Sequence, residues 1–173
     1  KVDKKTFVGK DVIHVAVFKK KDERTTYNMI YKDSDSGKSF MKRFHVTSVT
    51  RDKEYELTKG AKAEVLYFTA NPNGEAEVVT IHLRALQKLK KLRFDIDFSS
   101  LAIKGRGAGG NLVSKNSIKR IELKEGGVST LSARKIWYDD KVMRLNIDGI
   151  GTLLGEFQAD DKILVVKQNG TFQ

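Results

Sequence analysis

Short runs of β-forming apolar residues recur along this chain, and each is followed by a turn that contains asparagine, often with glycine after it. The three clearest copies begin at Ala63, Gly110 and Lys162. A spacing of roughly 45 to 50 residues is typical of propeller blades. No segment carries the apolar periodicity of an amphipathic helix. The sequence therefore predicts a single all-β domain over residues 1–173, a propeller-like ring of about four or more blades.

Further β-type segments lie between the turns, either as alternating patterns or as continuous apolar runs. We expect strands over residues 12–18, 27–31, 39–46, 64–69, 75–83, 94–98, 134–138, 142–147, 153–157 and 162–167. The Asn-Pro-Asn-Gly turn at 71–74 predicts a hairpin between two of these strands, and residues 111–123 predict a second hairpin. Residues 47–62 and 124–131 are expected to be connections.

A glycine-rich stretch at 104–110 carries two cations, Lys104 and Arg106, among four glycines. Three interpretations stay open. The glycines formally satisfy G-x-G-x-x-G, but that dinucleotide fingerprint requires a following helix, and a hairpin pattern follows here. Alternatively, the glycines serve only the tight geometry of a connection between strands. The third interpretation is a loop that binds a polyanion, because its two cations would stand exposed.

The charge balance favours a polyanionic partner. Lysine and arginine supply 33 residues against 22 acids, which gives a net charge of +11 and a pI near 9.7. Phosphate contacts dominate nucleic-acid affinity, although a basic surface without a specific partner is an alternative. Cysteine is absent and no apolar run is long enough for a membrane span, so we expect a cytoplasmic protein without a membrane partner. The chain begins at Lys1, and we expect a fragment of a longer protein.

The candidate contacts to a polyanion fall into two groups. The first group lies on the glycine loop and on turns and returning strands: Lys104, Arg106, Lys42, Arg43, Lys115, Lys119 and Arg120. The second group lies in the densest basic segment, at 84–94: Arg84, Lys88, Lys90, Lys91 and Arg93. That segment fits either a basic strand or a loop, and a lysine-rich edge that discourages strand addition is an alternative role. The paired cations of the returning strands could equally be solvated outward residues.

No catalytic or metal-binding constellation stands out in the sequence. His14, His45 and His82 are scattered, and each lies in or beside a strand-like run. A lone histidine in such a place is usually structural. We therefore predict no catalytic residue, no metal site and no cofactor in this chain.

Several stretches resemble one known family, the C-terminal domain of the DNA-cleaving subunit of the bacterial type IIA topoisomerases, DNA gyrase and topoisomerase IV. That family repeats an apolar strand with a Lys-x-Gly turn, a Lys-Arg pair on the returning strand and an arginine among glycines. The matching stretches here are 162–170, Lys42-Arg43, Lys119-Arg120 and 104–110. The resemblance runs from about residue 7 to the end. Residues 22–29 and 71–78 are similar to the topoisomerase IV-like enzymes of the Bacteroidetes group.

The resemblance implies a β-pinwheel, a propeller-like ring in which neighbouring blades partly exchange strands. It implies sequence-tolerant binding of double-stranded DNA, which bends or wraps around a basic outer rim and is presented to the cleavage core. The family's catalytic groups lie in other domains, so this domain alone is expected to be no enzyme. The parent would be the DNA-cleaving subunit of an ATP-dependent, Mg²⁺-using enzyme, and it would meet the ATPase subunit through the N-terminal part missing here.

Two distinctions stay open at this level. The gyrase box Gln-Arg-Arg-Gly-Gly-Lys-Gly is not intact at 103–109, which favours topoisomerase IV over gyrase. The alternative function is a β-propeller scaffold for protein partners, which would present an exposed aromatic or apolar patch. Trp137 and Tyr138 are the only candidates for such a patch, and packing in the core competes for them.

Overall fold

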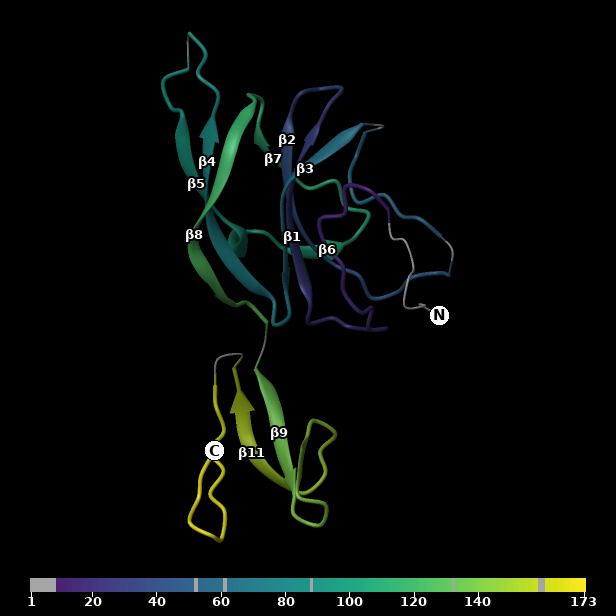
Figure 1. Cartoon of the computed structure of the whole chain (residues 1–173), viewed down its shortest axis with the longest axis vertical. Coiled ribbons are helices and arrows are strands. Elements are labelled where there is room, and N and C mark those ends of the chain that lie inside the picture. Colours follow the sequence, from purple (N-terminus) through teal and green to yellow (C-terminus); the bar gives the residue numbers. More distant parts are fainter. Residues whose placement is uncertain (1–8, 52, 61, 88, 132, 159–160) are drawn as a thin grey trace.

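The strands of this chain are short and gather into three separate sheets (Figure 1). The computed structural model describes residues 9–51, 53–60, 62–87, 89–131, 133–158 and 161–173. Its only helical element there is one 3-10 turn, η1 (Phe98–Ser100). The all-β prediction is confirmed. The strands are β1 (Thr26–Asp33), β2 (Ser39–His45), β3 (Ala63–Asn71), β4 (Glu75–Leu83), β5 (Arg93–Asp97), β6 (Ile103–Gly105), β7 (Asn111–Ser114), β8 (Ile118–Ser129), β9 (Arg134–Asp139), β10 (Arg144–Asn146) and β11 (Thr152–Phe157).

The first two sheets exchange the chain repeatedly. The first sheet has the order β3-β1-β2-β6, with β7 also paired to β2, and the second has the order β5-β4-β8. The chain therefore passes between them after β3, after β5 and after β7. Such exchange of strands between neighbouring units is the kind that the family resemblance implied.

Both expected hairpins are wrong in their pairing. The turn at 71–74 is tight, with the N–H of Gly74 bonded to the oxygen of Asn71 at 3.2 Å, but β3 pairs with β1 while β4 pairs with β5 and β8. Likewise β7 pairs with β2 and β8 with β4. A turn sequence fixes only the local reversal of the chain, whereas burial decides which sheet edge a strand joins. β4 is almost wholly buried because it occupies the centre of the second sheet.

The main core fills the space between these two sheets. Ile30 and Met41 of the first sheet pack against Val79 and Ile81 of the second, and Phe98 of η1 closes the cluster. Ile30, Val79, Ile81 and Phe98 have no solvent exposure. Burying a side chain of this size stabilises the fold by about 1.5–3 kcal/mol. The two sheets are therefore one packed body despite their separate hydrogen-bond ladders.

A buried arginine ties the crossings together. The Arg43 guanidinium donates to the oxygen of Gly74 at 3.0 Å, to the hydroxyl of Thr130 at 2.9 Å and to the oxygen of Leu101 at 3.4 Å. Its Nε donates to Asn28 Oδ1 at 3.1 Å, and Asn28 Nδ2 donates to the buried carboxylate of Glu77 at 2.7 Å. Gly74 follows β3, Leu101 follows η1 and Thr130 follows β8, so one side chain holds three junctions.

The third sheet stands apart from this body in Figure 1, with the order β10-β9-β11. After it comes a hairpin in which Val165 and Gln173 exchange two hydrogen bonds, at 3.1 and 3.0 Å. Three sheets and this hairpin make up the β structure of the described part of the chain, and the number of blades stays a prediction. The predicted strand at 162–167 is reduced to one bridge, between Val166 and Phe172. Among the described residues every buried side chain lies between Thr26 and Ser114, so neither the third sheet nor the hairpin after it contributes one.

Two other predicted segments differ from the structure. Residues 12–18 form no strand, and Val15 and Val17 are exposed. Residues 12–18 lie over a face of the first sheet, where the ring centroids of His14 and Phe68 are 5.4 Å apart. Residues 124–129, expected to be a connection, continue β8, because register shifts along its pairing with β4 keep the two strands bonded as far as Ser129.

We predict that Arg43→Met lowers the free energy of unfolding by about 3–5 kcal/mol, because Asn28 Oδ1 and the oxygen of Leu101 lose their donor and the buried Glu77 carboxylate loses the positive charge near it. Urea unfolding followed by far-UV circular dichroism measures this. The matched control is Lys119→Met, an exposed position at which a change within about 0.5 kcal/mol is expected. Equal stabilities of the two variants would contradict the role given to Arg43.

We also predict two unfolding transitions. Trp137 is the only tryptophan and lies in β9, so its fluorescence reports the third sheet alone. Because the buried side chains belong to the other two sheets, Trp137 should respond at a lower urea concentration than the far-UV signal of the whole chain. Coincident transitions in the two signals would show instead that the three sheets unfold as one unit.

Candidate nucleic-acid interface

The glycine loop at 105–110 is anchored from inside by Lys42. The ammonium of Lys42 donates to the oxygens of Leu57 at 2.6 Å, Arg106 at 2.6 Å and Ala108 at 2.8 Å. The residue is only 3% exposed, and this burial lowers the pKa of its ammonium to about 8. At neutral pH the group is still protonated, so its three N–H bonds match three carbonyl acceptors.

A second anchor explains one of the glycines. The Tyr31 hydroxyl donates to the oxygen of Gly109 at 2.6 Å. The next residue, Gly110, has φ +82°, and a Cβ there would lie 2.5 Å from the oxygen of Met41. Gly110 therefore has to be glycine, both for its backbone conformation and for the close approach of β2. β7, not a helix, follows the loop, which excludes the dinucleotide interpretation.

The cations of the loop and of its neighbour form a first basic patch, which we call the loop patch: Lys53, Lys59, Lys104 and Arg106. Lys104 is exposed in β6, while the Arg106 guanidinium lies 3.7 Å from the ring centroid of Tyr55 and donates to the oxygen of Ser48. Lys53 approaches the same ring at 5.3 Å. Lys53 and Lys59 come from the connection 47–60, which also carries the exposed Glu54 and Glu56.

A second basic patch, the end patch, lies at one end of the second sheet. The N–H of Arg84 bonds to the oxygen of Ser117 at 2.9 Å, and the N–H of Leu83 bonds to that of Leu92 at 2.8 Å. These bonds bring the segment after β4 beside the turn before β8, and residues 84–92 form no strand in the described part. The exposed cations gathered there are Arg84, Lys90, Lys91, Arg93, Lys115, Lys119 and Arg120. Lys88 lies outside the described residues.

The charges of the end patch are not all equally available. Arg120 lies 3.2 Å from Glu122, whose carboxylate also contacts His82 at 2.7 Å. Further along the outer face of the same sheet, Lys124 pairs with Asp95 at 2.8 Å. This outer face is therefore largely neutralised, and the cations for which no ion pair is found among the described residues concentrate at the end of the sheet.

The two patches are separated along β2. Lys104 pairs with Phe44, and Ser114, the residue before Lys115, pairs with Ser39. Phe44 and Ser39 are five residues apart, which corresponds to about 16 Å at 3.3 Å per residue. Rigid strands thus fix the spacing between the two groups of cations.

Lys42 and Arg43 do not belong to the exposed surface that was predicted for them. They are 3% and 2% exposed, and their charged groups bind carbonyls, a hydroxyl and an amide inside the fold. Neighbouring residues of a strand normally face opposite sides, which made one of the pair look outward. Here both faces of β2 are covered, one by the second sheet and the other by the loops. Their role is to hold the backbone.

The sequence did not point to Lys53 and Lys59. They come from a connection of mixed charge, which is brought to the glycine loop by the packing of Tyr55 against Arg106, by the bond from Lys42 to Leu57 and by the contact of Lys59 with Gly109. A lone aromatic residue in a charged connection was the available signal. Trp137 and Tyr138 are half-buried in β9 rather than part of an exposed aromatic patch.

Comparison with known proteins agrees with these features. Residues 1–125 and 144–173 match the family model described as the topoisomerase C-terminal domain of Bacteroidota. The chain belongs to this family, and its role is therefore associated with a topoisomerase. No curated protein sequence and no solved structure matches it. Within the described residues, no helix has the length and apolar character to cross a membrane, and no group of three or more metal-ligating side chains is placed to hold an ion.

We predict that Lys42→Met lowers the free energy of unfolding by about 2–3 kcal/mol, because three carbonyls lose their common donor. Hydrogen exchange should speed up at the amides of the loop, including Ala108, whose N–H bonds to the oxygen of Gly105. Lys104→Met, an exposed change in the same loop, is the control and should leave both measurements unchanged. Unchanged hydrogen exchange at the loop amides in Lys42→Met would show that the other contacts are enough to hold the loop.

Proposed function

We propose that this chain binds duplex DNA through its phosphates, with little regard to sequence, and bends it for a topoisomerase. The observation that supports this most directly is the pair of basic patches held about 16 Å apart by rigid strands. The surplus of 33 cations over 22 acids and membership of a topoisomerase domain family point the same way. Lysine and arginine on exposed loops suit phosphate contacts, which position a duplex without reading it.

The spacing of the patches suits a curved duplex. Each strand of B-DNA has one phosphate per about 3.4 Å of helix axis, so 16 Å measured along the axis corresponds to about five base pairs. Bending 20–30 base pairs by 40–90° costs about 1–6 kcal/mol, which several phosphate contacts can offset. No helix that could enter the major groove is present in the described part of the chain, which is in keeping with contacts to the backbone rather than to bases.

The finer identity of the parent belongs to this proposal. We place the chain in the DNA-cleaving subunit of a cytoplasmic, ATP-dependent type IIA enzyme, with ATP, Mg²⁺ and the ATPase subunit engaged by other parts of that enzyme. The broken gyrase box at 103–109 favours topoisomerase IV over gyrase. Lys42 and Gly110 hold the backbone of this loop in place. Its two cations, Lys104 and Arg106, would then serve as individual phosphate contacts and not as part of an intact gyrase box.

The test is the affinity of this chain for random-sequence duplexes of about 10 to 40 base pairs over a salt series. We expect affinity to climb with length and to fall with salt, with a slope of about −5 in log–log form if six phosphates are contacted. Arg84→Gln, Lys91→Gln and Lys115→Gln combined should reduce that slope by about 2–3 and weaken all sequences alike.

The matched control removes the same charge elsewhere, at three exposed lysines outside both patches: Lys38→Gln, Lys62→Gln and Lys141→Gln. We expect the control to keep the slope within about 1 of the unaltered chain. If both triple variants lose affinity equally, net charge rather than the end patch is responsible. Weak binding that does not respond to length or salt would refute the DNA-bending proposal.

A specific observation favours a second candidate, a scaffold for protein partners. The third sheet, its loops and the hairpin after it expose large apolar side chains: Leu145, Ile147, Ile150, Leu153, Leu154, Leu164, Val166 and Phe172. Apolar exposure of this kind often marks a protein contact. The salt series separates the two candidates, because a scaffold would bind duplexes weakly and at every length alike.

A further inference from the structure

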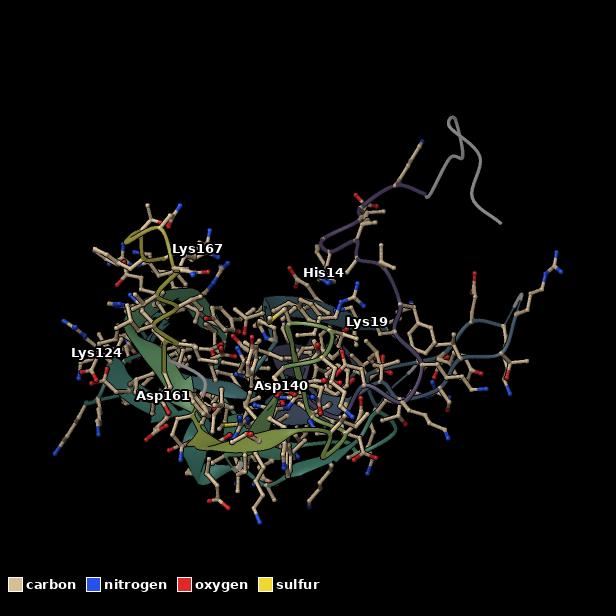
Figure 2. All side chains as sticks on the ribbon, turned by 90° about the horizontal axis from the view of Figure 1, so that it is seen from below. His14, Lys19, Lys124, Asp140, Asp161 and Lys167 are labelled. Carbon is tan, nitrogen blue, oxygen red and sulfur yellow. The ribbon has the colours of Figure 1, made fainter. Side chains whose placement is uncertain are left out.

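A cleft with mostly cationic walls lies away from both basic patches, where the third sheet joins the rest of the molecule. Its volume is about 670 Å³, and it is formed by residues 19–25, by the turn residues Pro72 and Asn73, and by Arg134 at the start of β9. The cations that line it are Lys19, Lys20, Lys21, Arg24 and Arg134. In Figure 2, Lys19 lies on the side of the molecule opposite Lys124, which belongs to the neutralised face of the second sheet.

The acids of this cleft leave its positive charge largely uncompensated. Asp22 is committed to its own turn, where its carboxylate accepts from the N–H of Arg24 at 2.9 Å and from the N–H and hydroxyl of Thr25 at 3.0 and 2.7 Å. Glu23 is exposed. Two acids thus face five cations, and one of the acids serves to shape the loop that presents those cations.

Arg24 and Arg134 lie close enough to repel each other. Burial and then the charge of Arg134 lower the pKa of the Arg24 guanidinium, and the opposite effects of Asp22 and Glu75 are smaller. Among the ion pairs found for the described residues, none involves either arginine. Two arginines that face one cleft, with no ion pair found for either among the described residues, are an arrangement that suits a phosphate, since each guanidinium can donate two parallel hydrogen bonds.

The linker before β9 keeps Arg134 at this place. Thr130 donates its N–H to the oxygen of Gly74 at 3.1 Å, and the hydroxyl of Ser129 donates to the oxygen of Asn73 at 2.6 Å. The side chain of Leu131 packs against Gly74. Arg134 follows Leu131 by three residues, so its backbone stays within about 10 Å of that turn whatever the orientation of the third sheet.

We propose that this cleft binds a phosphate group, and that the bound phosphate draws Arg24 and Arg134 together and so fixes the third sheet against the rest of the molecule. The phosphate can come from the DNA backbone or from a free phosphate. Only the first source rests on the proposed function. Arg134 lies outside the residues matched by the family model, whereas the other lining residues lie within them.

The test is a titration of the whole chain with inorganic phosphate, followed by NMR at the amides of Arg24 and Arg134 and by the fluorescence anisotropy of Trp137. We expect both amides to shift together and the anisotropy to rise, because a fixed third sheet tumbles with the rest of the molecule. Arg24→Gln with Arg134→Gln should weaken phosphate binding about tenfold or more. Lys38→Gln with Lys141→Gln removes the same charge from exposed positions elsewhere and should change nothing.

A second titration, with a duplex of about 20 base pairs, identifies the source of the phosphate. If the duplex shifts the same two amides and competes with inorganic phosphate, the site takes the DNA backbone. If inorganic phosphate shifts the two amides and the duplex does not, the site binds a free phosphate, and this conclusion holds even if the chain binds no DNA. Unshifted Arg24 and Arg134 amides with both ligands would overturn the proposal, and in that case DNA binding at the two patches would still be judged separately by the salt series.

Discussion

The buried guanidinium of Arg43 is the interaction on which the exchange of strands depends. The chain passes between the first two sheets at three places, and a crossing leaves backbone carbonyls without a strand partner. Arg43 supplies the donors for Gly74 and Leu101 and holds the exit linker through Thr130. Asn28 connects it to Glu77, so the buried charge has an acid within the same network. An apolar side chain in place of Arg43 would fill the space but leave the oxygen of Leu101 and Asn28 Oδ1 without this donor, so this topology favours an interior cation.

Whether a lysine or arginine is buried or exposed depends on whether buried backbone oxygens lie within reach of its charged group. Lys42 and Arg43 are buried because both faces of β2 are covered, and each finds backbone acceptors there. Lys104 lies in the short edge strand β6 and Lys115 follows the end of β7, and both are exposed. A strand network that is rigid inside therefore presents its available cations at its margins. This arrangement is what a surface needs to hold a stiff polyanion without adapting to its sequence.

Local patterns predicted most strands, because the alternation of apolar residues reflects a face that is buried whatever its partner. β1, β4 and β5 were predicted within one or two residues. The pairing was not predictable, because Asn71–Gly74 specifies a reversal of the chain but not which edge β4 joins. The run at 12–18 has the composition of a strand yet no edge to pair with in the described part. Burial of Lys42 and Arg43, and the meeting of Arg24 with Arg134, depend on contacts between distant segments that no spacing in the sequence encodes.

The third sheet is attached to the rest of the molecule differently from the way the first two sheets are attached to each other. The first two sheets share a core and three crossings, whereas the third sheet is joined through Leu131 and contributes no buried side chain in the described part. Fixing the orientation of the third sheet costs rotational freedom, and a ligand that bridges Arg24 and Arg134 would supply that ordering at the moment of binding. Asp22 and Glu75 offset the repulsion between the two arginines only in part. On the proposal above, a phosphate between them would offset the remainder and so set the orientation of the third sheet.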